Sequence, residues 1–355
     1  MADQQQISPQ HRAALFAQAT RQTWQPLPSI SATEGDTKSF DLPKTRLTSR
    51  IRVQVEAKLN VKHASATSYV PSPFAPYTML RSIELSVNNG FSPFKISGKQ
   101  AFMYSVMRED ASIVFPKTSG RGKNVQGLVA SAAGADNKVR LTLDLPLTIN
   151  DREPIGLVLT QNQETVVTVT MDIAKADQLG SDQAGYTFAL SDVKITPFVE
   201  SFSVPNIPQA IPDLSVLKLV QGATQAITGS GEQTYKFPTG MVYRKFAILI
   251  EDTNGKGMTD DEISANLEII FNQADIPYRV SSKMLAAINE EMYGRTLPDG
   301  MYVFDLTYQG VANYGGTRDY INTENLTEFW LKFNTAKAGN ITVVYENLTR
   351  MRTQG

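Results

Sequence analysis

Apolar and polar residues alternate strictly along several stretches of this sequence. In the longest, every second residue from Ile51 to Val61 is apolar, and the residues between them are Arg, Gln, Glu, Lys and Asn. Shorter stretches of the same kind begin at Val139 and Val167, and less regular ones begin at Leu267 and Phe329, where Ile270 and Trp330 lie among the intervening residues. Strict alternation is typical of a strand with one buried face, and one-sided strands are typical of antiparallel sheets. Because Gly and Pro separate these stretches, the pattern predicts an all-β protein of sandwich or barrel type.

Helical signals occur in a few places. Residues 97–109 and 281–292 each open with a Ser that can cap a helix. Near the N-terminus, Ser8 is a good capping residue and Pro9 suits the first helical position. The apolar positions that follow recur at helical spacing and predict one amphipathic helix that reaches as far as Trp24. They are Ala13, Phe16, Ala17, Thr20 and Trp24.

A proline-rich segment divides the chain. Residues 205–212 contain Pro205, Pro208 and Pro212, and such a run predicts a stiff, extended connector that cannot continue a sheet. The sequence therefore predicts four parts. They are an N-terminal amphipathic arm at 1–30, a first jelly roll at 31–204, the linker at 205–212 and a second jelly roll at 213–355.

An internal repeat supports two copies of one sandwich. The aligned pairs are 84–88 with 268–272, 93–97 with 277–281 and, at another offset, 173–177 with 335–339. The first two pairs each read as strand, turn, short strand and Ser-capped helix. We therefore expect Pro93 to superpose on Pro277 and Ser97 on Ser281. The interpretation is a duplicated eight-stranded antiparallel jelly roll with few short helices.

Composition narrows the function. The 355 residues contain 34 Lys+Arg and 35 Asp+Glu, a net charge of −1, which argues against direct nucleic-acid binding and eases self-association. There is no Cys, which excludes disulfides, thiolate metal sites and Cys nucleophiles. Two His residues are too few for most zinc or iron sites. We therefore expect neither a cofactor nor a bound metal.

Candidate catalytic motifs are weak. Residues 252–257 resemble the start of a calcium loop, but Lys256 occupies a ligand position, and a turn at Asn254-Gly255 is the better interpretation. The glycine-rich residues 118–123 lack the spacing of a phosphate-binding loop. No nucleophile–base pair is identifiable, so the sequence predicts that the protein is not an enzyme.

The N-terminal segment is mildly basic and carries apolar residues. No acidic residue occurs between Asp3 and Glu34. A frayed terminus is the simplest interpretation, but Phe16 and Trp24 on a helix outside both sandwiches would need a partner to bury them. The residues predicted to face a neighbouring subunit or a membrane are Arg12, Ala13, Phe16, Ala17, Thr20, Arg21 and Trp24. Removal of residues 1–25 is then expected to leave the folded chain intact.

Two motifs carry a family resemblance. Gln5-Gln6-Ile7-Ser8-Pro9, followed by Ala13-Ala14-Leu15, resembles the opening helix of tectivirus major capsid proteins. Leu297-Pro298-Asp299-Gly300-Met301-Tyr302, followed by Tyr308-Gln309-Gly310, resembles a segment late in their second jelly roll. The length of the chain is closest to tectiviruses of Bacillus-type hosts.

The resemblance implies a double jelly-roll coat protein of a tailless, icosahedral bacteriophage. It implies homotrimers of pseudo-hexagonal outline, contacts between trimers in the shell, and contacts with vertex and minor capsid proteins. It also implies that the shell surrounds an inner membrane, which the N-terminal arm approaches. The protein would be assembled in the host cytoplasm and located in the virion.

The alternative is a jelly-roll protein that binds or cleaves carbohydrate. Such a protein needs exposed aromatic platforms or a pair of carboxylates about 5–10 Å apart. Aromatic residues make up 9% of the chain and are dispersed, and the duplication predicts no obvious cleft.

Overall fold

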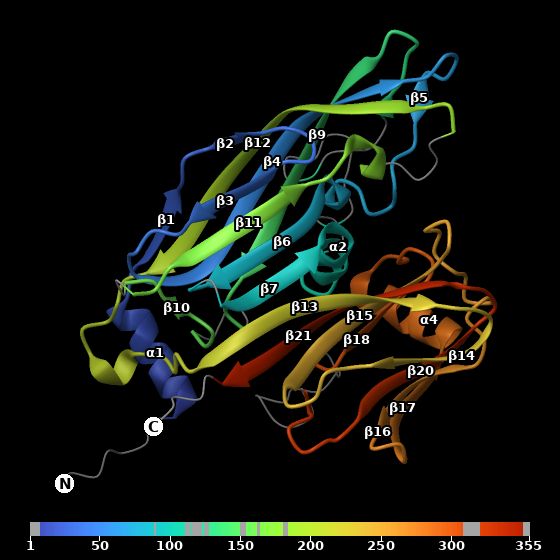
Figure 1. Ribbon diagram of the computed structural model, residues 1–355. Helices are drawn as coiled ribbons and strands as arrows, with labels where there is room; N and C mark the ends of the chain where they lie inside the picture. Colours follow the sequence, from blue (N-terminus) through green and yellow to red (C-terminus); the bar gives the residue numbers. More distant parts are fainter. Residues whose placement is uncertain are drawn as a thin grey trace.

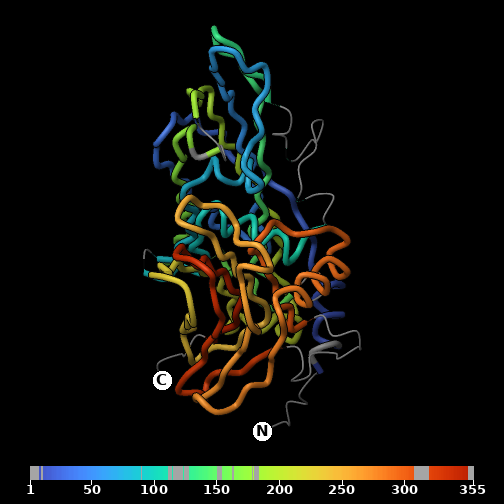
Figure 2. The backbone as a smooth tube through the Cα atoms, turned by 90° about the vertical axis from the view of Figure 1, so that its right-hand side faces the viewer, coloured from blue at the N-terminus to red at the C-terminus, as the bar shows by residue number. Residues whose placement is uncertain are grey.

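Two β-sandwiches lie next to each other and share one long sheet (Figure 1). The computed structural model describes residues 8–88, 90–110, 114, 123, 128–149, 154–161, 164–179, 184–307 and 320–350. Residues 5–7 and 308–310, which carry part of the family resemblance, lie outside them, as do residues 118–122 of the glycine-rich loop. Turned by 90°, the molecule is elongated, with the first sandwich above the second (Figure 2).

The first sandwich consists of two facing sheets. One has the order β1-β12-β4-β10, with β2 also beside β12 and β9 beside β4. Its strands are β1 (Gln22–Pro26), β2 (Ile30–Ala32), β4 (Leu47–Lys62), β9 (Ala135–Pro146), β10 (Val158–Leu159) and β12 (Thr187–Phe202). The other sheet contains β3 (Thr37–Asp41), β11 (Val167–Ile173), β6 (Leu80–Val87) and β7 (Phe91–Ser97). The remaining elements are β5 (Ser68–Tyr69), β8 (Leu128–Val129), η1 (Tyr77–Met79), η2 (Ala176–Leu179) and the helix α2 (Gly98–Val106).

Strand β4 shows why the alternation predicted the sheet. Its residues Ile51, Val53 and Val55 are buried in the first core, whereas Arg52 between them is exposed. β4 pairs with β12 on one side and β9 on the other, both antiparallel. One face of this sheet therefore forms the core and the opposite face carries charged side chains.

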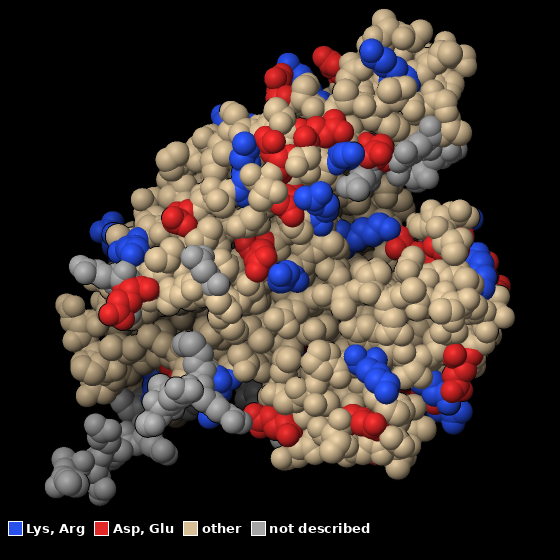
Figure 3. Space-filling view, viewed as in Figure 1, with Lys and Arg blue, Asp and Glu red and all other residues tan. Residues whose placement is uncertain are grey.

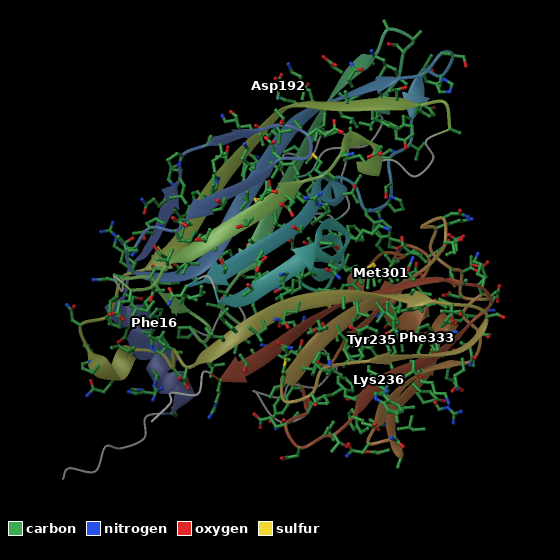
Figure 4. The ribbon with its side chains drawn as sticks, viewed as in Figure 1. Phe16, Asp192, Tyr235, Lys236, Met301 and Phe333 are labelled. Carbon is green, nitrogen blue, oxygen red and sulfur yellow. The ribbon has the colours of Figure 1, made fainter. Side chains whose placement is uncertain are left out.

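The second sandwich repeats this arrangement. One sheet contains β13 (Val216–Ile227), β21 (Gly339–Arg350), β15 (Val242–Asp252) and β18 (Met301–Asp305), with β19 (Ile321–Asn322) beside β15. The other contains β14 (Gly231–Lys236), β20 (Phe329–Thr335), β16 (Asn266–Phe271) and β17 (Asp275–Ser281). The core between them is aromatic, and the rings of Phe237 and Phe329 stack with their centroids 4.6 Å apart. Tyr235 and Phe333 belong to the same cluster (Figure 4).

The two sandwiches are jelly rolls of the same topology, as the sequence predicts. The strands of the two jelly rolls correspond one to one in chain order and in sheet position. The pairs are β3 with β14, β4 with β15, β6 with β16, β7 with β17, β9 with β18, β11 with β20 and β12 with β21. β1 and β2 lie beside β12 as β13 lies beside β21. The fold is a double jelly roll.

The predicted repeat is confirmed in the hairpins that precede α2 and α4 (Ser282–Tyr293). Ser82 pairs with Ser97 across one hairpin, and the residues 184 positions later, Asn266 and Ser281, pair across the other. The pairing register of each hairpin shifts at the same place, after Leu85 in the first and after Ile269 in the second. Ser97 and Ser281 each cap the helix that follows by accepting a backbone N–H three residues on.

The junction between the jelly rolls departs from the antiparallel expectation. β7 of the first jelly roll pairs in parallel with β13 of the second, with Val220 opposite Phe94 and Gln221 opposite Lys95. This pair joins two sheets into one that runs β3-β11-β6-β7-β13-β21-β15-β18. The two edge strands belong to different jelly rolls, so their relative direction is set by how the jelly rolls pack and not by a hairpin.

The proline-rich linker is not fully extended, contrary to the prediction. A 3₁₀ turn, η3 (Pro208–Ala210), interrupts it. Pro208 suits the first position of such a turn because its φ is fixed near the helical value. Ala210 is buried, and η3 packs against α1 (Pro9–Ala19).

Candidate interaction surfaces

The N-terminal helix is shorter than predicted. Ser8 caps α1 by accepting the backbone N–H of His11 at 3.2 Å, but the helix ends at Ala19. Thr20 is extended, and its hydroxyl donates to the Phe16 carbonyl at 2.7 Å. Trp24 lies on β1, directly opposite Glu200 of β12. The prediction that Phe16 and Trp24 share one helical stripe is therefore wrong, because the β-forming residues Thr23 and Trp24 join an available sheet edge.

Phe16 is buried by its own chain, not by a partner. Its exposed fraction is 5%, and it packs in a small apolar cluster with Leu47 and Leu157. Its ring lies edge-on to that of Phe202, with centroids 5.3 Å apart. Figure 4 shows Phe16 on the side of α1 next to the first jelly roll. The expectation that it lies outside both sandwiches is wrong, since α1 covers the lower end of the first one.

The other residues of the predicted arm differ in exposure. Ala17 and Arg21 are exposed, whereas Arg12, Ala13 and Thr20 are half-buried. The pKa of Asp213 is lowered, mainly by the Ser215 hydroxyl bonded to it, with smaller contributions from Arg350 and Arg12. Part of the Arg12 charge is thus compensated within the chain. Among the described helices, none is long and apolar enough to cross a membrane.

Trp24 is the exposed large apolar residue of this segment. Its exposed fraction is 67%, the largest after Val70 among the exposed large apolar residues of the described chain. Its indole ring lies 6.0 Å from the ring of Phe198 on the neighbouring strand, in an edge-on arrangement. Both rings therefore lie on the outer face of the sheet that contains β4, away from the core.

The surface that α2 presents is covered by the second jelly roll. Gln100 of α2 donates from its side-chain amide to the carbonyls of Val343 at 3.2 Å and Ala223 at 3.4 Å. The Tyr104 hydroxyl donates to Glu346 at 3.0 Å, and Lys99 pairs with Glu251 at 2.6 Å. A Cβ at Gly222 would lie 2.5 Å from the Gln100 amide, so this strand position needs a glycine for Gln100 to approach. Met301 lies on the side of the second jelly roll toward α2 (Figure 4).

Two opposite charges are buried at this junction. Lys218 is fully buried and donates to the Thr148 carbonyl at 2.6 Å, with Glu346 at 4.0 Å. Burial lowers the pKa of Lys218 to about 7, although Glu346 opposes this. Burial alone would raise the pKa of Glu346, but the cations around it, Lys218 first and then Arg244, Lys245 and Arg108, together lower that pKa. The junction therefore holds a polar network between two jelly rolls, and each group in it depends on its partners.

The alternating pattern did not predict this junction, although the sequence contains a signal for it. Residues 246–250 form a continuous apolar run instead of an alternating one. In β15 their side chains alternate between two cores: Phe246 and Ile248 face their own jelly roll, whereas Ala247 and Leu249 belong to the core cluster of the first. A continuous apolar strand is typical of burial on both faces.

A cleft of about 890 Å³ lies between the jelly rolls, contrary to the expectation that the duplication leaves none. Its lining includes Phe74, Arg81, Lys99, Lys256 and Asp299. Phe74 is the single aromatic residue of that lining and is 4% exposed. Within the described part of the chain, no three His, Asp or Glu residues gather as a metal site.

Residues 252–257 form a turn, as the sequence predicts. The Asp252 carboxylate accepts the backbone N–H groups of Asn254 at 2.9 Å and Lys256 at 3.0 Å. Gly255 has a positive φ of 75°, which glycine adopts without strain. The Asp252 carboxylate is therefore used by its own loop.

Charge is mixed over the visible surface. Figure 3 shows Lys and Arg interspersed with Asp and Glu, and wide areas without charge. No continuous basic stripe of the kind that follows a nucleic-acid backbone is seen on this face.

Residues 218–351 match the family described as viral coat protein P2 C-terminal domain. That segment covers most of the second jelly roll and less than half of the chain. No curated protein shows a significant sequence match to this chain.

Solved structures resemble the whole chain in fold. The STIV MCP superposes with a TM-score of 0.68 at 14% identity, covering 93% of this chain and 97% of that chain. The major capsid protein P2 from Bacteriophage PM2 gives 0.56 at 12% identity, covering 94% and 100%. The Faustovirus major capsid protein gives 0.61 at 9% identity, covering 93% and 90%.

Proposed function

We propose that this chain is a viral major capsid protein and that three copies form its stable unit. The observation that carries the proposal is the double jelly-roll fold along the chain, together with the coat-protein match of residues 218–351. The match and the capsid proteins of like fold favour a structural role over an enzymatic one. The proposed building blocks are the jelly rolls at 31–204 and 213–355, joined by the linker at 205–212. Of the predicted arm at 1–30, β1 (Gln22–Pro26) forms part of the first jelly roll.

Two similar blocks in one chain suit a shell tile. Three chains supply six jelly rolls, so a three-fold trimer has an almost six-fold outline that can pack against six neighbours. Closed symmetry within the trimer buries permanent interfaces. Contacts between trimers can each be weak, since they are repeated across the shell. The near-neutral charge of −1 limits repulsion between copies.

The finer proposal follows the resemblance to tectiviruses of Bacillus-type hosts. The trimers tile the icosahedral shell of a tailless bacteriophage, assembled in the host cytoplasm, around an inner membrane. Vertex and minor capsid proteins are the further partners, and direct nucleic-acid binding is not part of the role.

The N-terminal arm has a divided role in this proposal. The side of α1 that carries Ala17 and Arg21 is exposed and can approach the membrane or an adjacent trimer. Phe16 anchors α1 to the first jelly roll, so the arm is held at a fixed place. Trp24 is left for contact with another protein surface.

The carbohydrate alternative is less well supported. The cleft between the jelly rolls is large enough for a small sugar, but Phe74 is buried and offers no stacking platform. Asp299 is the single carboxylate of its lining, whereas glycoside hydrolysis commonly uses two.

Electron microscopy of the purified protein tests the proposal. We expect class averages of a three-chain particle with six lobes around a central axis. A field of single two-lobed molecules, together with saturable binding to immobilised glycans, would favour the carbohydrate alternative instead.

A further inference from the structure

The two hairpin–helix units differ in what covers them. The unit of β7 and α2 lies against the second jelly roll. The matching unit of β17 and α4 exposes Ile276 at 43%, Met284 at 57% and Ile288 at 41%. In the shared frame of the hairpins, Met284 and Ile288 take the places of Gln100 and Tyr104, the residues that bond to the second jelly roll. The outer copy therefore carries apolar side chains where the inner copy makes an interface.

The sheet of each jelly roll that could cover such a unit has the same strand register. In the pairing of β12 with β4, the register skips one β4 residue next to Glu200. In the pairing of β21 with β15, the register skips one β15 residue next to Glu346. Both glutamates are buried. Directly opposite them on the neighbouring strand lie Trp24 and Val220, respectively. Trp24 is thus the counterpart of Val220, the residue that pairs with Phe94 at the junction between the jelly rolls.

We infer that β17 of one copy pairs in parallel with β1 of a second copy, and that Trp24 inserts beside Tyr278 under α4. Tyr278 is the hairpin counterpart of Phe94, since each lies opposite the matching residue of the preceding strand, Ile269 or Leu85. This inference rests on the proposed trimer and identifies the surfaces that form it. The contact between chains would repeat the contact within the chain.

The placement of the two edges requires a second copy. Among the described strands, β17 ends one sheet and β1 ends another. Figure 1 shows β1 at the left of the first jelly roll and β17 at the lower right of the second, so they cannot meet within one molecule. A contact between two different surfaces is head-to-tail and closes into a ring when its rotation allows.

The side chains on the two surfaces are complementary. Trp24 is larger than its counterpart Val220, while Ile288 is smaller than its counterpart Tyr104. The extra volume on one surface is therefore offset by the smaller side chain on the other. Lys283 is the counterpart of Lys99. Glu56 is the counterpart of Glu251, because each lies six residues after the strand residue that pairs with Glu200 or with Glu346. Glu56 already pairs with Arg140 at 2.6 Å, and by analogy with the Lys99–Glu251 pair we expect Lys283 of a second copy to join that pair. Trp24 is the kind of large aromatic residue on which interface affinity is concentrated.

The absence of Cys allows a clean cross-linking test. We would replace Trp24→Cys and Tyr278→Cys together in the full chain, because opposed strand residues lie within the reach of a disulfide. Oxidation should give covalent dimers and trimers on a non-reducing gel, and reductant should remove them. The matched control combines Tyr278→Cys with Val129→Cys, an exposed residue on β8. Neither this pair nor either single variant should give covalent trimers.

A charge substitution supplies a second test that does not need a disulfide. Trp24→Glu should raise the concentration at which the trimer half-dissociates by at least about 30-fold. Val129→Glu should leave that concentration unchanged. If the unaltered protein is a trimer but Trp24→Glu has no effect and the cysteines do not cross-link, the inferred interface is wrong and the proposed function stands. If the unaltered protein is a single chain, the proposed trimer and the inferred interface both fail.

Discussion

The helices α2 and α4 begin alike, each at a capping Ser after a hairpin of the same register, but their surroundings differ. α2 is buried along nearly its whole length, whereas Met284 and Ile288 of α4 are exposed. The hairpin backbone was retained in both copies, while the side chains that leave the helix diverged. Gln100 and Tyr104 form directed hydrogen bonds to a partner that is always present. The backbone frame thus identifies equivalent positions, and the side chains show which of them lie in an interface.

The largest expected difference in the free energy of unfolding comes from truncating the side chain at the equivalent position of each helix. Tyr104→Ala should lower the free energy of unfolding of the chain by about 3–5 kcal/mol, because it leaves a cavity and removes the hydrogen bond to Glu346. Ile288→Ala should change it by less than about 0.5 kcal/mol when the chain is dissociated. Urea unfolding of both variants, each combined with Trp24→Glu to dissociate the trimer, measures the difference. Equal losses would show that α4 is held by its own jelly roll as firmly as α2 is held by both.

A second contrast lies within the N-terminal segment. Phe16→Ala should cost about 1.5–3 kcal/mol, because Phe16 is buried with Leu47 and Leu157. Trp24→Ala should leave the stability of the dissociated chain nearly unchanged, since its side chain is exposed. Thermal unfolding distinguishes them. The same geometry revises the expectation for removal of residues 1–25, which should now destabilise the first jelly roll because β1 and Phe16 are lost. A truncated chain as stable as the full one would contradict this.

The pH dependence of stability tests the buried lysine of the junction. The pKa of Lys218 is about 7 in the folded chain, below its ordinary value of 10.5. Between these values the unfolded chain binds the proton and the folded chain does not, so stability should rise as the pH increases from 7 to 9. Lys218→Met should abolish this rise. Lys236→Met, on the opposite side of the second jelly roll, is the control and should keep it (Figure 4).

Gln22 of β1 is the counterpart of Lys218 of β13. The register places Gln22 opposite Phe202, as Lys218 lies opposite Leu348, and Gln22 is exposed. Replacing Gln22→Met should therefore leave the pH profile of the unaltered chain in place. A rise that persists in Lys218→Met would show that another group is responsible.

The smallest effect is expected at the exposed lysine of α4. Lys283 pairs with Asp261 at 2.6 Å, but the side chains are 67% and 82% exposed. Exposed ion pairs contribute little, so Lys283→Met should not measurably change the unfolding of the dissociated chain. Its effect should appear instead in trimer formation, where loss of the pair with Glu56 weakens association at low salt and makes it less sensitive to salt. Titration of trimer mass against salt concentration checks this.

The sequence predicted the β-sandwiches because alternation records one buried face, as in Ile51 to Val61. It predicted the repeat because the hairpins keep capping and turn residues at fixed spacing, Ser97 and Ser281 among them. The junction was missed because strand pairing between two jelly rolls depends on which edges meet, and Val220 and Phe94 are far apart in sequence. The N-terminal helix was predicted too long because Ala13, Phe16 and Thr20 fit a helical period, whereas Trp24 pairs with β12 through backbone bonds that no side-chain period reports.

The mass of the purified protein in solution decides whether three chains form the stable unit. Light scattering at micromolar concentration should give three times the chain mass of 39.1 kDa, and dilution to nanomolar concentration should preserve it for hours. A mass of 39.1 kDa at micromolar concentration would contradict the account, because the exposed face of α4 and the exposed Trp24 would then have no second copy to cover them.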